Sequence, residues 1–268
     1  MKRKYQLTAK NADIYDLYEQ SVQSVEFEVE FINKMFKRYN RGICLDIRED
    51  FCSSAFISTE WVKAKNKNAY AVDIDKSALK IAHEKAKNRI SKEQLNRLFL
   101  IKGNSLNVKL KKVNCILATN FSYWVFKERE SLKKYFFNTY NNLKKNGIFI
   151  LDAFGGYEAH QELEEKTKHK NFTYVWDQSS FNPINNDLTC YIHFEFNDGS
   201  KINKAFKYDW RLWSLPEITE CLKAAGFKQV DIYMQGWDKK KDEESDKFYC
   251  VKKCDADAGW IAYIVALR

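Results

Sequence analysis

The chain has 268 residues, of which 45% are hydrophobic and 15% aromatic, enough for one large domain with a substantial core. Its formal charge of +9 would suit an acidic partner, but the lysines are scattered among Asp, Glu and Asn. We therefore expect nucleic-acid binding to be at most weak and non-specific. No stretch approaches the length of a membrane helix and the charged start lacks an apolar core, so neither a membrane span nor a signal peptide is expected.

The seven cysteines lie mostly inside apolar runs, as Cys115 and Cys190 do. This is the usage of reduced, buried thiols, which predicts a cytoplasmic protein. Cys250 and Cys254 form a close pair, but no second pair and no histidine accompany them, so no metal site is predicted.

The first part of the chain is predicted to be helical over Asp13–Tyr39. Ile43–Arg48 is a short apolar run typical of a buried parallel strand. The hydroxyl side chains of Ser53-Ser54 can cap the helix that follows. Ala69–Val72 is the next strand, and Asp73 stands at its carboxyl end.

Strand and helix continue to alternate, which predicts a largely parallel sheet. The expected elements are a helix that starts within Asp75–Ala78 and runs to about Ile90, a strand Leu98–Lys102, a strand Val113–Thr119, a helix Ser131–Leu143 closed by Lys144–Gly147, and a strand Ile148–Leu151.

The pattern then changes to short alternating runs between Phe172 and Trp213, with a hairpin turn at Asn197–Ser200, which predicts an antiparallel insertion. A helix from Leu215 and two final strands, Gln229–Met234 and Trp260–Leu267, follow. Asp238–Lys247 is expected to be a charged loop.

The turn after the first strand, EDFCSSA, contains no glycine. Dinucleotide-binding turns use glycines so that the backbone approaches the pyrophosphate, and this absence argues against NAD or FAD. Asp73 stands about 20 residues past the turn, where such folds place the acid that binds ribose hydroxyls. A nucleoside ligand without phosphate, such as S-adenosylmethionine (SAM), meets both conditions.

These residues resemble class I SAM-dependent methyltransferases, in which an acid precedes a Gly-Cys-Gly-Thr-Gly type turn. Glu49 matches the acid and Cys52 the cysteine, whereas Phe51, Ser53 and Ala55 replace glycines. More narrowly, the chain resembles a bacterial subgroup with the turn REDFC-(G/S)-(T/S)-A. The likeness extends through NFSYW, LDAFGG, FTYVWDQSSFNP, IHFEF and YDWRLW.

The resemblance implies an α/β, Rossmann-like sheet of seven strands, the last of them antiparallel. It implies a single SAM-binding domain with a helical lid over residues 1–40 and a core over residues 41–154 and 214–268. Residues 155–213 would form a β-rich insertion for substrate recognition. The cofactor would be SAM, with S-adenosylhomocysteine (SAH) as its product.

The resemblance also implies a set of site residues. At the position of Asn104 the family carries an acid that meets the adenine amino group, and the amide oxygen can accept the same bond. The expected cofactor residues are Arg48, Glu49, Phe51, Cys52, Ser53, Asp73, Ile74, Asn104, Ser105, Asn120 and Phe121.

Asn120-Phe121-Ser122-Tyr123 lies where amino-group methyltransferases carry Asn-Pro-Pro-Tyr, which makes Asn120 and Tyr123 the catalytic candidates. Both prolines are missing, so a lining role beside the methyl group stays open. Candidates for the substrate wall, each weighed against plain packing, are Tyr15, Tyr18, Trp124, Asp152, Trp176, Asn182, His193, Arg211 and Trp213.

The predicted function is methyl transfer from SAM to an acceptor, with a small molecule favoured because the insertion is aromatic and lacks a basic stripe. The positive charge motivates an RNA or protein methyltransferase as the alternative enzyme. The glycine-free turn motivates a non-catalytic binding protein with the same fold.

Overall fold

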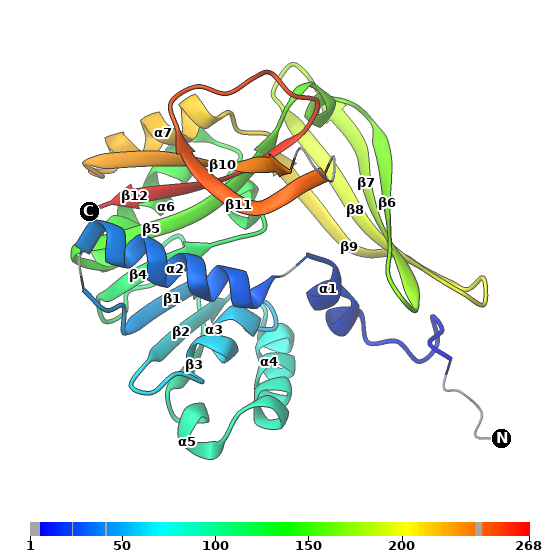
Figure 1. Ribbon diagram of the computed structural model, residues 1–268, viewed down its shortest axis with the longest axis horizontal. Helices are drawn as coiled ribbons and strands as arrows, with labels where there is room; N and C mark the ends of the chain where they lie inside the picture. The colour runs from blue at the N-terminus through cyan, green and yellow to red at the C-terminus, as the bar shows by residue number, and fades with distance from the viewer. Residues whose placement is uncertain (1–5, 23, 41, 239–242) are drawn as a thin grey trace.

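A computed structural model describes residues 6–22, 24–40, 42–238 and 243–268. Eight strands of this described part form one main sheet (Figure 1). In spatial order they are β11 (Glu243–Val251), β10 (Gln229–Asp238), β12 (Trp260–Leu267), β5 (Leu143–Gly155), β4 (Val113–Ala118), β1 (Asp46–Asp50), β2 (Asn68–Asp73) and β3 (Leu98–Lys102).

The strands from β5 to β3 are parallel, whereas β12 is antiparallel to both β5 and β10. This arrangement confirms the predicted Rossmann-like α/β class. The expected number of seven strands is wrong, because β11 pairs antiparallel with β10 at the edge. Part of the predicted charged loop therefore belongs to a strand, and residues 239–242 of that loop lie outside the described residues.

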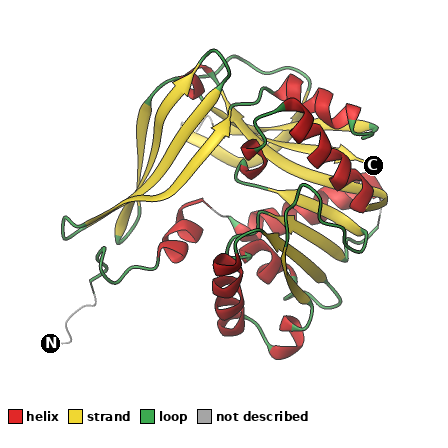
Figure 2. Cartoon of the chain, turned by 180° about the vertical axis from the view of Figure 1, so that it is seen from behind, coloured by secondary structure: helices red, strands yellow, loops and turns green. Residues whose placement is uncertain are grey.

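Helices cover both faces of the main sheet, as Figure 2 shows from behind. Helices α2, α3 and α4 pack on one face, and α6 and α7 pack on the other. The helices are α1 (Ile14–Val22), α2 (Val25–Asn40), α3 (Phe56–Trp61), α4 (Lys76–Arg89), α5 (Lys92–Leu95), α6 (Arg129–Asn142) and α7 (Leu215–Ala224), with 3-10 turns η1 (Ser122–Val125) and η2 (Tyr157–His160).

A second, antiparallel sheet follows β5, as the sequence predicted. It contains β6 (Leu163–Lys168), β7 (Phe172–Asn182), β8 (Asp187–Phe196) and β9 (Lys201–Arg211). Buried and half-buried residues alternate along β8, and its buried face is apolar. Helix α1 places Leu17 and Tyr18 against this face, and Figure 1 shows the helix between the second sheet and the main body.

Three local predictions need correction. Helix α3 begins after Ala55, which has a φ of 52°, and no side chain caps it, so Ser53 and Ser54 are not its caps. Ile43 is 76% exposed and lies before β1. Lys144–Gly147 does not close a helix: α6 ends at Asn142, and the lysine-rich segment is already part of β5.

A buried ion pair connects the centre of the sheet to α6. Arg48 and Asp50 have fully buried side chains, and Arg48 Nε donates to Asp50 Oδ1 at 2.7 Å. Asp50 Oδ2 accepts from Arg48 Nη2 and from the Tyr135 hydroxyl. A carboxylate in this position depends on these donors, since burial alone favours its neutral form and raises its pKa.

Replacing Arg48 with methionine should therefore destabilise the fold strongly. The change leaves Asp50 without its charged partner, and we expect a loss of about 3–5 kcal/mol in the free energy of unfolding. Urea denaturation measures it. The matched control is Lys63→Met, which removes an exposed pair with Glu60 and should cost less than about 1 kcal/mol. Equal losses in the two variants would contradict this account.

Candidate functional site

Two turns, at the carboxyl ends of β1 and β4, contain non-glycine residues in the left-handed backbone conformation. In the first, φ is 56° at Phe51, 47° at Ser53 and 52° at Ala55. In the second, φ is 56° at Asn120 and 57° at Phe121. Each such residue costs roughly 1–2 kcal/mol relative to a right-handed conformation, so the surrounding structure must hold these turns in place.

Asp73, at the end of β2, supports the first turn. Its Oδ2 accepts from the Ser53 amide at 2.8 Å and its Oδ1 from the Asp75 amide at 2.8 Å. The Cys52 amide donates to the Val72 carbonyl at 3.1 Å. The carboxylate thus lies directly beside the glycine-free turn, where the sequence placed a ribose-binding acid.

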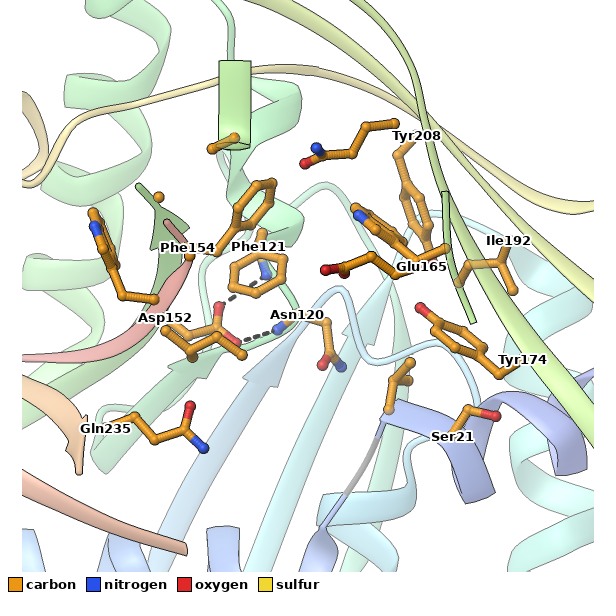
Figure 3. Close-up of a pocket in the computed structure, with 18 of the residues that line it drawn as sticks. Ser21, Asn120, Phe121, Asp152, Phe154, Glu165, Tyr174, Ile192, Tyr208 and Gln235 are labelled. Atoms are coloured by element: carbon orange, nitrogen blue, oxygen red, sulfur yellow. Dashed lines mark hydrogen bonds between the residues drawn. The ribbon is translucent and has the colours of Figure 1, made fainter. Parts of the chain in front are cut away.

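Asp152, near the end of β5, supports the second turn. Its two carboxylate oxygens accept from the amides of Asn120 at 2.7 Å and Phe121 at 2.8 Å, as the dashed lines in Figure 3 show. Burial raises the pKa of Asp152 to about 7, although these two donors favour the charged form. Asp152 is therefore a residue that positions the turn.

The structure contradicts Tyr123 as a catalytic residue. Its side chain is fully buried, and its hydroxyl donates to the backbone oxygen of Asp152 at 2.8 Å. Trp124 is also fully buried and lines neither of the two cavities described below. Asn120 differs from both, because it lines the cavities described next.

A cavity of about 570 Å³ lies between the main sheet, α1, α2 and the second sheet. Figure 3 shows labelled side chains from the main sheet, α1 and the second sheet around one space. Among its lining residues are Ser21, Glu28, Asn120, Phe121, Asp152, Phe154, Glu165, Tyr174, Trp176, Ile192, Tyr208, Trp210, Gln235, Trp260 and Tyr263.

A smaller cavity of about 170 Å³ lies beside the glycine-free turn. It shares Tyr18, Asn120 and Tyr208 with the large cavity, so these side chains stand between the two. The residues that line it are Tyr18, Glu49, Phe51, Cys52, Ser53, Thr119, Asn120, Ser122, Phe206 and Tyr208.

Glu49 and Cys52 face the small cavity from the end of β1. Burial raises the pKa of Glu49 to about 7, and hydrogen bonds from the amide and hydroxyl of Ser58 act in the opposite direction. Burial also raises the pKa of the Cys52 thiol well above its usual value. A thiol kept protonated is a poor nucleophile, so Cys52 is suited to lining the cavity.

Helix α1 brings two predicted residues to the site. Tyr15 lies near the turn after β2, since burial and then the carboxylates of Asp75, Asp13 and Asp73 raise its pKa. Tyr18 lines both cavities. The rings of both residues contact Phe206 of the second sheet.

Ion pairs join α1 to α4. Arg89 Nη2 contacts Glu19 Oε2 at 2.6 Å, and Lys85 pairs with Asp16. The helix is thus held from one side by the main body and from the other by the apolar face of the second sheet.

Five predicted cofactor residues line neither of these two cavities: Arg48, Asp73, Ile74, Asn104 and Ser105. Arg48 is fully buried in its pair with Asp50, which contradicts direct cofactor contact. Ile74 is 66% exposed at the end of β2. Asn104 Oδ1 accepts from the Leu106 amide at 2.9 Å, and Ser105 is buried behind it. The amide oxygen expected at adenine already accepts a local bond.

Of the predicted substrate wall, Tyr18, Asp152 and Trp176 line the large cavity. The prediction is wrong for two polar residues on the second sheet. His193 Nε2 pairs with Asp177 at 3.1 Å, and its Nδ1 accepts from the Lys204 amide. Asn182 is exposed at the end of β7.

The prediction is also wrong for Arg211 and Trp213. The Arg211 guanidinium contacts Glu217 at 2.9 Å and lies 3.9 Å from the ring centre of Trp213. Trp213 itself is 1% exposed within the core formed with α6 and α7. Both residues fasten the second sheet to α7, away from the cavities.

Many cavity residues were missed by the sequence analysis, among them the polar residues Glu28 on α2 and Gln235 on β10. A signal for Glu28 was present, because it stands three residues after buried Val25 and four before buried Ile32. A carboxyl group on the apolar face of an amphipathic helix is unusual and indicates a special role. Gln235 follows an ordinary strand pattern and gave no such signal.

Within the part of the chain that the structure describes, none of the helices has the length and apolar content that a membrane crossing requires. No protein-family model matches the sequence, and no curated protein matches it.

Many solved structures match the fold. A SAM-dependent methyltransferase from Clostridium acetobutylicum has a TM-score of 0.69 and 21% identity, covering 95% of this chain and 96% of its own. SAM-bound CalS10, an amino pentose methyltransferase from Micromonospora echinaspora, has a TM-score of 0.66 and 10% identity, covering 99% and 100%. The sugar N-methyltransferase KedS8 from Streptoalloteichus has a TM-score of 0.63 and 12% identity, covering 100% and 98%. The chain therefore has the fold of these SAM-dependent methyltransferases.

Proposed function

We propose that the protein is a SAM-dependent methyltransferase that acts on a small molecule. The observation that carries this proposal is the pair of cavities that meet at Asn120, beyond the carboxyl ends of the parallel strands. Ligands of open α/β sheets bind at this edge. The small cavity is lined by the glycine-free turn, which Asp73 supports through Ser53, and would take the donor. The large cavity would take the acceptor.

The size of the large cavity supports a small acceptor. Its volume of about 570 Å³ falls within the range of ordinary small-molecule sites, and three layers of structure surround it. The matched structures include an amino pentose methyltransferase and a sugar N-methyltransferase, which agrees with this choice. All seven cysteines are free, which supports a reducing, cytoplasmic compartment.

Methyl transfer from a sulfonium is an in-line displacement that requires mainly alignment and exclusion of water. Asn120 is the remaining candidate of the two proposed for catalysis, since it borders both cavities. Its side chain would line the transferred methyl, and Asp152 would hold it there through the backbone. Tyr15 and Tyr18 would cover the donor from α1.

Calorimetric titration with SAM and NAD tests the donor. We expect SAM to bind and NAD not to bind, because the turn lacks the glycines that a pyrophosphate needs. Asp73→Ala should weaken SAM by roughly 1.5–3 kcal/mol, the contribution of hydrogen bonds to a charged group. Asp198→Ala, in the exposed hairpin between β8 and β9, is the control and should leave SAM affinity unchanged. Comparable binding of NAD, or no binding of SAM, would refute the proposal.

A second experiment tests the support of the Asn120 turn. Asp152→Asn keeps one acceptor but places an NH₂ group against a backbone amide, so we expect a loss of roughly 1–3 kcal/mol in the free energy of unfolding. Urea denaturation measures it, and weaker SAM binding should accompany it. The control is Asp177→Asn in the second sheet, which should cost less. If Asp152→Asn retained full stability and SAM affinity, Asp152 would not hold this turn.

A further inference from the structure

The large cavity is acidic and aromatic in a protein that is otherwise basic. The chain carries 45 lysines and arginines, yet the described residues that line the cavity include no lysine, arginine or histidine. Four carboxylic acids line it: Glu28, Asp152, Glu158 and Glu165. A cavity with this lining favours a positively charged occupant.

Glu28 has the most unusual surroundings of these acids. It is 6% exposed, and its Oε2 is buried without a hydrogen-bond donor among the described residues. Burial is the first cause that raises its pKa, and the carboxyl groups of Glu49 and Asp152 add to it. The phenol groups of Tyr18 and Tyr263 lie close enough for the charge of Glu28 to raise their pKa values. A buried acceptor among acids and phenols is costly unless a ligand supplies a donor.

Gln235 provides a second, independent acceptor in the same cavity. Its Nε2 donates to the backbone oxygen of Ser245 at 3.3 Å, which fixes the orientation of the amide. Its Oε1 is buried and also lacks a donor in the described chain. Figure 3 shows the Gln235 side chain on the same side of the space as Asp152. Two unsatisfied acceptors from different elements thus border one cavity.

Aromatic rings complete the lining. Tyr208 and Trp210 stack with ring centres 4.3 Å apart, and Trp176 lies 6.2 Å from Trp210. Tyr174 and Trp260 also face the cavity. Aromatic faces attract cations and also cover the apolar part of an organic ligand. A small inorganic ion has no apolar part to cover, so this lining favours an organic cation.

We propose that the large cavity binds an organic acceptor carrying a protonated amine, and that Glu28 and the Oε1 atom of Gln235 accept hydrogen bonds from its ammonium group. The inference rests on the proposed function in treating this cavity as the acceptor site. A neutral polyol can donate to Gln235, whereas an ammonium group also stabilises the ionised form of Glu28, which its buried surroundings disfavour. Glu28 is then the residue that selects cations, whichever acceptor atom receives the methyl group.

Calorimetry on the full chain saturated with SAH tests the proposal. The probes are 2-phenylethylamine, phenyltrimethylammonium and the neutral 2-phenylethanol. We expect both cations to bind saturably and the alcohol to bind at least about tenfold more weakly, because only the cations pair with Glu28. Equal binding of amine and alcohol, or no binding of either cation, would overturn the proposal.

Variants assign the effect to residues. Glu28→Gln keeps the side-chain shape and removes the charge, so both cations should bind at least about tenfold more weakly and the alcohol as before. Gln235→Leu should weaken the amine but not phenyltrimethylammonium, which has no N–H to donate. The matched control is Glu26→Gln on the exposed face of α2, which should change nothing. Unchanged cation affinity in Glu28→Gln would contradict the inference.

A parallel titration with SAM separates this inference from the proposed function. If Glu28→Gln weakens SAM binding by the same factor as cation binding, Glu28 balances the positive charge of the donor sulfonium and the inference is wrong. If the wild type does not bind SAM, the proposed function fails instead. The cation titrations, repeated without SAH, then still decide whether Glu28 recognises cations.

Discussion

Two carboxylates that accept backbone amides from left-handed turns are the constraint on which the site depends. Asp73 accepts from Ser53, and Asp152 accepts from both Asn120 and Phe121. Such bonds to a charged acceptor contribute about 1.5–3 kcal/mol each, comparable with the roughly 1–2 kcal/mol that a left-handed residue costs. In this way the fold keeps its tight turns without glycine. The side chains of Phe51 and Ser53 therefore line the small cavity at positions where a glycine-rich turn has no side chain.

The second sheet and α1 turn the edge of the main sheet into a partly open cavity. The antiparallel sheet contributes aromatic rings from β7 and β9, and α1 fills the space between that sheet and α4. Carboxyl groups at the ends of β1 and β5 and on α2 make this space acidic. Partial enclosure strengthens the electrostatic effect of these groups, since the interior screens charge less than water. The same layers would shield the proposed sulfonium donor from water.

Much of the fold was predictable because apolar runs and capping residues are local signals. The predicted bounds of β3 and β12 agree with the structure, and α4 begins after Asp75 as expected. The errors lie in charged segments that pair with a neighbouring strand although their composition is typical of a loop or a helix end. The charged segment of β11 becomes a strand because β10 offers it an edge, and Lys144–Gly147 joins β5 because β4 pairs with it.

For the candidate site, the sequence placed Asp73 and Asn120 at the carboxyl ends of two strands, where the structure also has them, but it did not reveal side-chain directions. The consecutive left-handed residues Asn120 and Phe121 turn the chain so that Tyr123 enters the core, which no local pattern reveals. Likewise, the bonds of His193 to Asp177 and of Arg211 to Glu217 depend on contacts made only in the folded state. The acidic lining of the cavity emerges only when α2, β5 and the second sheet meet.

The central claim is that SAM binds between Asp73 and Asn120, on turns held by carboxylates. A crystal structure of the protein with SAH tests it most directly. The account predicts the ribose hydroxyls on Asp73 and the sulfur beside Asn120, facing the large cavity. It also predicts that Ser53, Asn120 and Phe121 keep positive φ. SAH bound elsewhere, or turns that change conformation and release Asp73 and Asp152, would contradict it.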